Sequence, residues 1–131
     1  QNLMGVIDSA IVCKFPLFGG LTVDPLIEAI NAVTGWDLDR DEFFRMGERI
    51  FNIKRLYNNR LGISRKDDTL PQRMLKLKRG GGTNYLPPLN EMLHEYYQYR
   101  GWNEFGIPTE EKVKELGLEE YYNLLNEKEG D

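Results

Sequence analysis

The sequence of 131 residues contains one cysteine, one histidine and no long hydrophobic run, and each scarcity excludes a class of protein. A single cysteine excludes an internal disulfide framework, which is typical of a chain kept in a reducing cytoplasm. No apolar run approaches the roughly 20 residues that a membrane-spanning helix requires. The segment from Gln1 to Met4 also lacks the basic region of a secretory signal. We therefore expect a cytoplasmic protein without a membrane partner.

Positive charge is in deficit as well, because 17 lysines and arginines face 21 aspartates and glutamates. A general nucleic-acid binder needs clustered cations in excess, so no nucleic-acid partner is expected. The one basic cluster, Lys76 to Arg79, runs directly into the glycine triplet Gly80 to Gly82. We interpret this stretch as a solvated loop with a flexible turn, since the triplet lacks the spacing of a phosphate-binding loop.

Groups able to perform catalysis are few. With His94 as the single histidine, neither a histidine metal cluster nor a Ser-His-Asp arrangement is possible, and its place beside Leu93 indicates a structural or surface role. The tyrosines, above all those at 96, 97, 121 and 122, are compatible with a binding platform or with core and rim packing. Their helical spacing favours packing.

Hydrophobic residues make up 40% of the sequence and charged residues 29%, which is the composition of a globular protein. Proline and glycine divide the sequence into helical blocks, and nowhere does apolar and polar character alternate as in a half-buried strand. The fold class is therefore predicted to be all-α, with residues 1–131 forming a single helical domain around one core.

We expect helices over residues 2–12, 25–34, 39–60, 71–75, 89–101 and 108–125, the last broken at Gly117, followed by a frayed tail from Glu127. Asp24 is predicted to cap one helix, with Pro25 in its first turn. Asp39 and Glu42 have the spacing of a capping box. The helix that they begin should pack Phe43, Ile50 and Tyr57 into the core.

The first block is apolar on most sides, which predicts a neighbour outside this sequence. The face bearing Leu3, Val6, Ile7 and Ile11 should accordingly be exposed in the chain alone. Since the sequence does not start with methionine, we expect it to begin partway along a longer protein. Asp8 lies within this apolar stretch, where a buried carboxylate needs a partner.

Cys13 follows the apolar stretch and has two interpretations. A lone cysteine in such surroundings is most often an inert buried thiol. Its thiolate is also a metal ligand, although one thiolate cannot hold an iron-sulfur cluster, which usually takes four. Any cluster role therefore requires ligands from elsewhere.

Several segments carry a specific resemblance. They read Thr34-Gly35-Trp36-Asp37, Gly47-Glu48-Arg49-Ile50-Phe51-Asn52, Asn59-Arg60-Leu61-Gly62, Ser64-Arg65-Lys66-Asp67-Asp68-Thr69-Leu70-Pro71 and Glu95-Tyr96-Tyr97-Gln98-Tyr99-Arg100-Gly101-Trp102. In this order, the sequence from Asp8 to about Tyr121 resembles the carboxyl-terminal domain of the tungsten-containing aldehyde:ferredoxin oxidoreductase family. That family's third domain is all-helical, which agrees with the periodicity.

The resemblance implies a tungsten (or molybdenum) bis-pterin cofactor beside a [4Fe-4S] cluster, in an enzyme that oxidises aldehydes to carboxylates and passes electrons to ferredoxin. The family's D-x-x-G-L-C element supplies an aspartate that binds pterin and the fourth cluster cysteine. By position, Asp8 becomes the cofactor-binding residue and Cys13 the metal ligand. The expected partners are the upstream domains of the same enzyme, ferredoxin and an aldehyde. The other three cluster cysteines and the acid/base groups precede this region, so no catalytic residue is assigned here.

The sequence departs from that element at Ile11-Val12, where the family has Gly-Leu. A glycine lets the backbone approach a ligand closely, and isoleucine does so less easily. In a continuous helix, Asp8 and Cys13 would point about 140° apart and lie about 7.5 Å apart along the axis. They would then contact two adjacent bodies, a pterin and a cluster, if the helix ends before Cys13 and Pro16 delays the next one.

Two alternatives stay open at the level of the sequence. Arg60 and the segment Arg65 to Asp68 either support the cofactor cavity or form ion pairs within a loop. The chain as a whole is either a domain that completes an oxidoreductase, inactive by itself and without bound cofactor, or a free-standing helical interaction module that has lost the cofactor. A companion C-x-x-C-x-x-x-C segment would favour the first, and a gene encoding these residues alone would favour the second.

Overall fold

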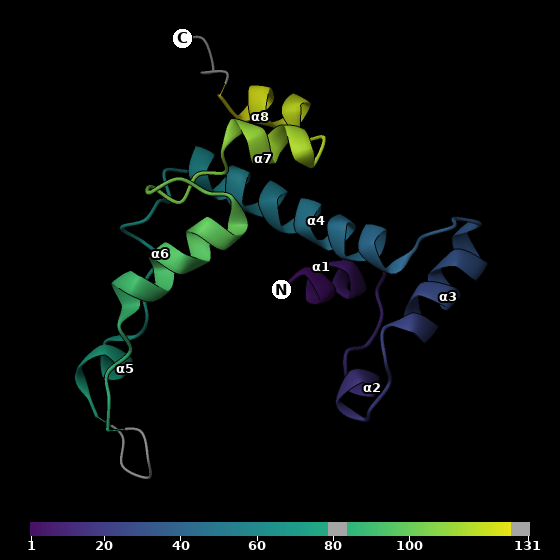
Figure 1. Ribbon diagram of the computed structural model, residues 1–131, viewed down its shortest axis with the longest axis horizontal. Helices are drawn as coiled ribbons and strands as arrows, with labels where there is room; N and C mark the ends of the chain where they lie inside the picture. The colour runs from purple at the N-terminus through teal and green to yellow at the C-terminus, as the bar shows by residue number, and fades with distance from the viewer. Residues whose placement is uncertain (79–83, 127–131) are drawn as a thin grey trace. The chain divides into compact units, whose positions relative to one another are not determined.

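The fold is all-α, as predicted, in a computed structural model that describes residues 1–78 and 84–126. The described residues form eight helices (Figure 1): α1 (Asn2–Ser9), α2 (Phe15–Phe18), α3 (Asp24–Thr34), α4 (Arg40–Arg60), α5 (Gln72–Lys76), α6 (Leu89–Arg100), α7 (Glu110–Glu115) and α8 (Glu119–Asn126). The described β structure is an isolated bridge between Trp102 and Pro108. The predictions for the glycine triplet and for the tail from Glu127 lie outside the described residues.

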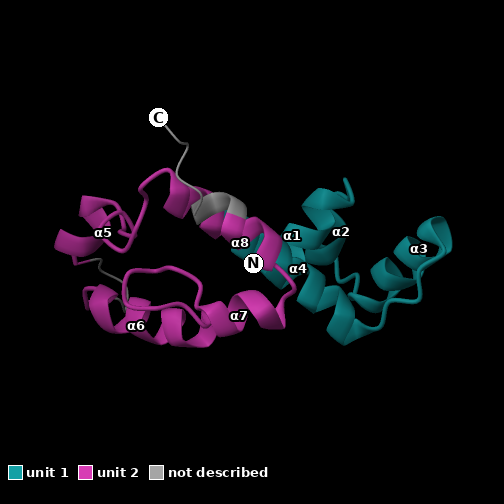
Figure 2. Cartoon of the chain, turned by 90° about the horizontal axis from the view of Figure 1, so that it is seen from above, with its two compact units in different colours: residues 1–54 teal, residues 55–131 magenta. Residues whose placement is uncertain are grey.

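The chain forms two compact units, residues 1–54 and residues 55–131, and the boundary falls within α4 (Figure 2). The first unit holds α1 to α3 and most of α4. The second holds the end of α4 and all later helices. None of the helices in the described ranges has the length and apolar character of a membrane-spanning segment.

The core of the first unit is built on Val6, Ile27 and Phe43. Partly buried apolar residues surround these three: Leu3, Val23, Ile30, Leu38, Phe44 and Met46. Gly47 of α4 lies against the backbone of α1, because a Cβ at this position would lie 2.2 Å from the Asn2 carbonyl oxygen. A glycine is therefore required where α1 crosses α4.

The capping box of α4 is confirmed. The Asp39 carboxylate accepts from the Glu42 N–H at 2.8 Å, and the Glu42 carboxylate accepts from the Asp39 N–H at 3.5 Å. Phe43 is fully buried as predicted and Ile50 half-buried, but Tyr57 is exposed. The prediction for Tyr57 is wrong because it assumed one core. Leu56 is buried instead, about 140° around the helix from Phe43, so the two ends of α4 bury different faces.

Helix α1 also differs from its prediction, since it ends at Ser9 rather than near Val12. Val6 and Ile7 are almost fully buried and Leu3 half-buried by the chain itself, while Ile11 is 94% exposed. The expectation that this face of α1 is unusually exposed is therefore wrong for most of its members. Exposed apolar residues gather instead beyond the end of the helix, at Ile11, Phe15 and Phe18.

Other helix ends lie close to their predicted positions. Asp24 is the first residue of α3 rather than its cap, with Pro25 in the first turn as expected. Thr109 caps α7 by accepting the Lys112 N–H at 3.3 Å. The second unit buries Tyr97, Trp102, Val113, Leu116 and Leu118 around these elements.

Candidate functional site

The backbone after α1 determines how Asp8 and Cys13 are presented. The Ile11 N–H donates to the Asp8 carbonyl at 3.2 Å and the Val12 N–H donates to the Ile7 carbonyl at 2.9 Å. These two bonds form a Schellman motif, which requires a left-handed residue at the position of Ile11. Its φ is 56°. Because the helix ends here, Asp8 and Cys13 do not share a continuous helix.

Ile11 is the one non-glycine residue with a positive φ in the described part of the chain. The same pair of hydrogen bonds ends α4, α6 and α7, where glycines 62, 101 and 117 adopt the left-handed conformation. An isoleucine in this conformation costs roughly 1–2 kcal/mol. At Ile11, where the resembled family has glycine, the backbone of this chain adopts the left-handed conformation that glycine adopts most easily.

Asp8 lies in the last turn of α1 and is exposed to solvent. The expectation that its carboxylate needs a partner in an apolar environment is therefore wrong, because α1 turns this position to water. Cys13 is also exposed, which does not match the buried-thiol interpretation. Helix α2 begins only two residues later with Pro16 in its first turn, so this proline does not delay the next helix.

Cys13 is not part of a complete metal site within the described residues. Within residues 1–78 and 84–126, no group of three or more histidines, cysteines, aspartates and glutamates could hold a metal ion. An exposed cysteine on a short connection fits one position of a four-cysteine cluster, with the other three ligands supplied from elsewhere. An exposed carboxylate similarly fits a hydrogen-bond acceptor for the N–H groups of a pterin.

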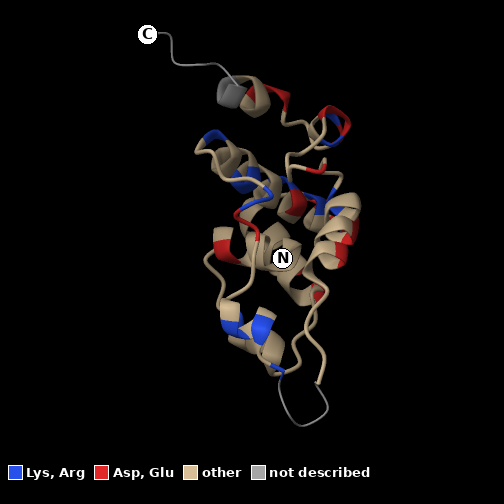
Figure 3. Cartoon of the chain, turned by 90° about the vertical axis from the view of Figure 1, so that its left-hand side faces the viewer, with Lys and Arg blue, Asp and Glu red and all other residues tan. Residues whose placement is uncertain are grey.

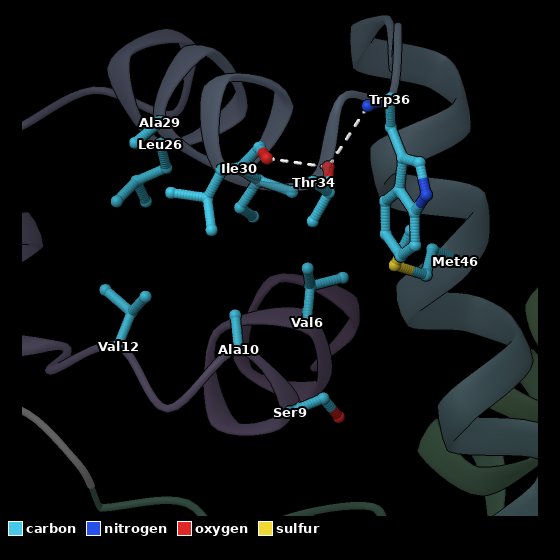
Figure 4. Close-up of a pocket in the computed structure, with 11 residues that line it drawn as sticks. Val6, Ser9, Ala10, Val12, Leu26, Ala29, Ile30, Thr34, Trp36 and Met46 are labelled. Carbon is cyan, nitrogen blue, oxygen red and sulfur yellow. Dashed lines mark hydrogen bonds between the residues drawn. The ribbon is translucent and has the colours of Figure 1, made fainter.

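An apolar groove of about 480 Å³ adjoins the segment between Asp8 and Cys13, wholly within the first unit (Figure 4). Its walls are Val6, Ser9, Ala10, Val12, Leu26, Ala29, Ile30, Val33, Thr34, Trp36 and Met46. None of these residues is charged. The Ser9 hydroxyl donates to the Gly5 carbonyl, and the Thr34 hydroxyl donates to the Ile30 carbonyl and accepts from the Trp36 N–H. The groove therefore favours an apolar occupant.

The second unit contains a buried polar network centred on Arg55. Its guanidinium binds both carboxylate oxygens of Asp68, with N···O distances of 2.9 and 2.6 Å, and its Nε donates to the Gly106 carbonyl at 2.6 Å. The Tyr97 hydroxyl donates to the same carboxylate. The guanidinium carbon lies 4.8 Å from the centre of the Trp102 ring. These contacts hold the loop of Asp68 against α4, α6 and the turn at Gly106.

The network shifts two pKa values. Burial alone would raise the pKa of Asp68, but hydrogen bonds from Arg55 and Tyr97, together with the charges of Arg55 and Arg65, outweigh it and lower that pKa. Burial, the hydrogen bond to Asp68 and the Asp68 charge raise the pKa of Tyr97 to about 12. Asp68 is thus held as a carboxylate and Tyr97 as a neutral phenol. Asp68 does form an ion pair, but with Arg55 of α4 rather than within its own loop.

Gly106 allows the network to close. A Cβ at Gly106 would lie 2.2 Å from an Arg55 guanidinium nitrogen and 2.9 Å from the Tyr97 hydroxyl, and its φ is 73°. The turn is further held by the Arg65 N–H, which donates to the Phe105 carbonyl at 3.0 Å. Sequence reasoning missed the role of Arg55 because the contact joins residues 51 positions apart.

The remaining candidates are structural. His94 is exposed, and its Nε2 lies 3.1 Å from the Gln98 amide nitrogen. Tyr97 is buried and its ring packs with Trp102 at 5.7 Å, as the packing interpretation predicted. The sequence of helix α5 contains basic residues and no acidic ones, which colours its ribbon blue without red in Figure 3, and Lys76, expected in a loop, is its last residue. Leu75 lies at a helical position, and the helix continues from it to Lys76.

The groove, too, was missed by sequence reasoning. Its α3 wall includes Leu26, Ile30 and Val33, which recur at helical spacing on one face of the helix. Leu26 is buried, but Val33 is 87% exposed. Periodicity identifies an apolar face without showing what covers it.

Comparison with known proteins connects this geometry with a family. A family model described as "Aldehyde ferredoxin oxidoreductase, domains 2 & 3" matches residues 1–118. A tungsten-containing aldehyde ferredoxin oxidoreductase of Pyrococcus horikoshii is 45% identical over 124 residues, which are 92% of this chain and 20% of the relative. The corresponding Pyrococcus furiosus protein is 42% identical over 125 residues, 93% of this chain and 20% of the relative.

A more distant relative carries a different description. The aliphatic sulfonate oxidoreductase, WOR-like subunit, of Pyrococcus furiosus is 31% identical over 123 residues, 86% of this chain and 19% of the relative. The chain therefore spans about a fifth of the length of the curated relatives that it matches.

Proposed function

Since the chain belongs to the aldehyde ferredoxin oxidoreductase family as its carboxyl-terminal domain, we propose that it completes the cofactor site of a tungsten (or molybdenum) bis-pterin enzyme that oxidises aldehydes to carboxylates. The observation that carries the proposal is the match over residues 1–118, in which Asp8 and Cys13 keep the spacing of the D-x-x-G-L-C element. In this proposal residues 1–131 act as one domain, in the cytoplasm, and are inactive without the rest of the enzyme.

Cys13 is the residue that would hold the metal cluster. Its exposed thiol can contribute one thiolate to a [4Fe-4S] cluster whose other three ligands come from upstream domains. When bound, such a cluster supplies electron transfer from the pterin-bound metal to ferredoxin. The Schellman motif supports this role because it ends α1 before Cys13 and frees the thiol from the helix.

Asp8 would bind the pterin. A carboxylate accepts hydrogen bonds through two oxygens, and the exposed side chain of Asp8 carries no desolvation cost before binding. Because the helix ends with a left-handed residue at Ile11, Asp8 and Cys13 can each bind one of two neighbouring groups. No residue of this chain is assigned to the acid/base chemistry of the reaction.

The residues that select the substrate would lie in the part of the enzyme outside this sequence. Relatives described as aldehyde ferredoxin oxidoreductases and one described as an aliphatic sulfonate oxidoreductase share this domain, so the domain itself does not select between the two classes. Four-tenths identity or more to the aldehyde enzymes favours an aldehyde. The free-standing interaction module becomes the better account only if the gene encodes these residues alone.

Thiol alkylation of the intact enzyme tests the role of Cys13. We expect the Cys13 peptide to resist iodoacetamide while iron is bound and to react after anaerobic removal of iron by a chelator. In the 131-residue chain the same thiol should react at once, because it is exposed. Equal reactivity with and without iron would show that Cys13 is not a ligand.

A further inference from the structure

Several large apolar side chains in the groove of the first unit, or close to it in the sequence, are exposed. Val33, in its wall, is 87% exposed, and Trp36 is 54% exposed. Ile11, which precedes the wall residue Val12, is 94% exposed. Phe15, three positions after Val12, is 70% exposed. An apolar groove with exposed apolar side chains in its wall is typical of an interface.

Ile11 adds an independent argument. Its side chain is almost fully exposed while its backbone adopts the left-handed conformation that costs an isoleucine roughly 1–2 kcal/mol. Glycine occupies the equivalent position in the caps of α4, α6 and α7. The Ile11 side chain is 94% exposed, so packing within the described residues does not offset this cost, whereas a contact with another surface would.

We propose that the apolar groove and Ile11 form the docking surface for an uncharged, apolar segment of the upstream part of the same polypeptide. The matched relatives have about four-fifths of their length outside the region shared with this chain, which supplies such a segment. The lining carries no charge, and its two hydroxyl groups already bond to the backbone, so the surface recognises shape and apolar character. The inference rests on the proposal that this chain is one domain of a larger enzyme.

Docking at this surface has a consequence for the cofactor residues. The groove is lined by Ser9, Ala10 and Val12, which lie between Asp8 and Cys13 in the sequence. A segment seated in the groove would therefore hold the connection that presents the carboxylate and the thiol. The docking surface is in this sense a positioning device, and none of its residues contacts the reacting atoms.

Cysteine accessibility at Ala29 tests the proposal, since Ala29 lines the groove and is exposed. An Ala29→Cys variant of the intact enzyme is treated with a thiol reagent and followed by peptide mass spectrometry. The reference is the same variant of the 131-residue chain, with folding checked by helical circular dichroism. The matched control is Glu28→Cys, the neighbouring exposed position on α3 that does not line the groove.

We expect labelling at position 29 to be at least about tenfold slower in the intact enzyme than in the 131-residue chain, and labelling at position 28 to change by less than about threefold. Equal rates at position 29 would overturn the proposal. Protection that appears only on addition of an aldehyde would show a small-molecule site, and protection that depends on the concentration of the 131-residue chain would show a second copy. Either result would also overturn it.

A second variant guards against a local effect of the introduced thiol. Val33→Glu should leave the helicity of the 131-residue chain unchanged because Val33 is exposed. In the intact enzyme it should accelerate hydrogen exchange in α3, whereas Val33→Ile should not. Unchanged exchange in the glutamate variant would contradict docking. Since neither test measures iron, loss of the Cys13 role and loss of the docking surface give separate results.

Discussion

At the scale of single residues, one left-handed isoleucine and one half-buried carboxylate show how local chemistry governs this chain. Ile11 keeps a backbone conformation that glycine would adopt without strain. Asp68 accepts hydrogen bonds from Arg55 of α4 and from Tyr97 of α6. Ile11 strains the first unit, and Asp68 stabilises the second unit.

Replacing Ile11 by glycine should stabilise the 131-residue chain. The change removes the steric cost at φ 56°, which is partly offset by the greater entropy of glycine in the unfolded chain. We expect a net gain of about 0.5–1 kcal/mol in the free energy of unfolding, measured by urea denaturation. Ile11→Ala should give a smaller gain, since alanine keeps the Cβ. A glycine variant less stable than wild type would contradict the strain.

Replacing Asp68 by asparagine should destabilise the chain by about 3 kcal/mol, because the Arg55 side chain is only 8% exposed and would lose its counter-charge. This estimate is the lower end for a broken buried pair, since Asp68 keeps some contact with water. The control Asp67→Asn, at an exposed neighbour, should cost less than about 1 kcal/mol. Equal losses in the two variants would contradict the role of the network.

The same network predicts how stability changes with pH. The pKa of Asp68 is lowered on folding, so its contribution is present above about pH 4 and is lost as the pH falls below that value. The pKa of Tyr97 is raised to about 12, so its contribution is present below about pH 10 and is lost as the pH rises toward 12. Urea denaturation at pH 7 and pH 3 should show the difference between wild type and Asp68→Asn shrinking in acid.

At the scale of elements, close backbone contact decides where α1 lies on α4. Gly47→Ala should destabilise the first unit by about 2–3 kcal/mol, because the added methyl would lie 2.2 Å from the Asn2 carbonyl oxygen. Gly5→Ala is the matched control. Its methyl would lie 3.4 Å from the Gly47 carbonyl oxygen, an ordinary contact, and alanine favours the helix. If thermal unfolding shows Gly5→Ala to be less stable than Gly47→Ala, the close contact between α1 and α4 would be contradicted.

The helices were largely predictable because their ends are local. The capping box of Asp39 and Glu42, and the glycines that follow α3, α4 and α6, act within a few residues of each helix end. Helix α2 could not be predicted, since its four residues carry no period. The cap at Ile11 was missed because sequence signals for a left-handed residue depend on glycine or asparagine.

At the scale of the whole molecule, burial depends on contacts that the sequence does not display. A single core was assumed for α4, so Tyr57 was placed inside and Leu56 was overlooked. The candidate site was predicted from family resemblance alone, because Asp8 and Cys13 carry no distinguishing local pattern. Their exposure and the adjoining apolar groove became apparent only with the fold.

The most direct test of the central claim, that this domain supplies the fourth ligand of an iron-sulfur cluster, is the iron content of the intact enzyme carrying Cys13→Ala. Loss of one thiolate of four should lower bound iron and stop electron delivery to ferredoxin. The neighbouring control Lys14→Gln should retain both. A Cys13→Ala enzyme with full iron occupancy and unchanged electron transfer would contradict the account and return Cys13 to the role of an inert surface thiol.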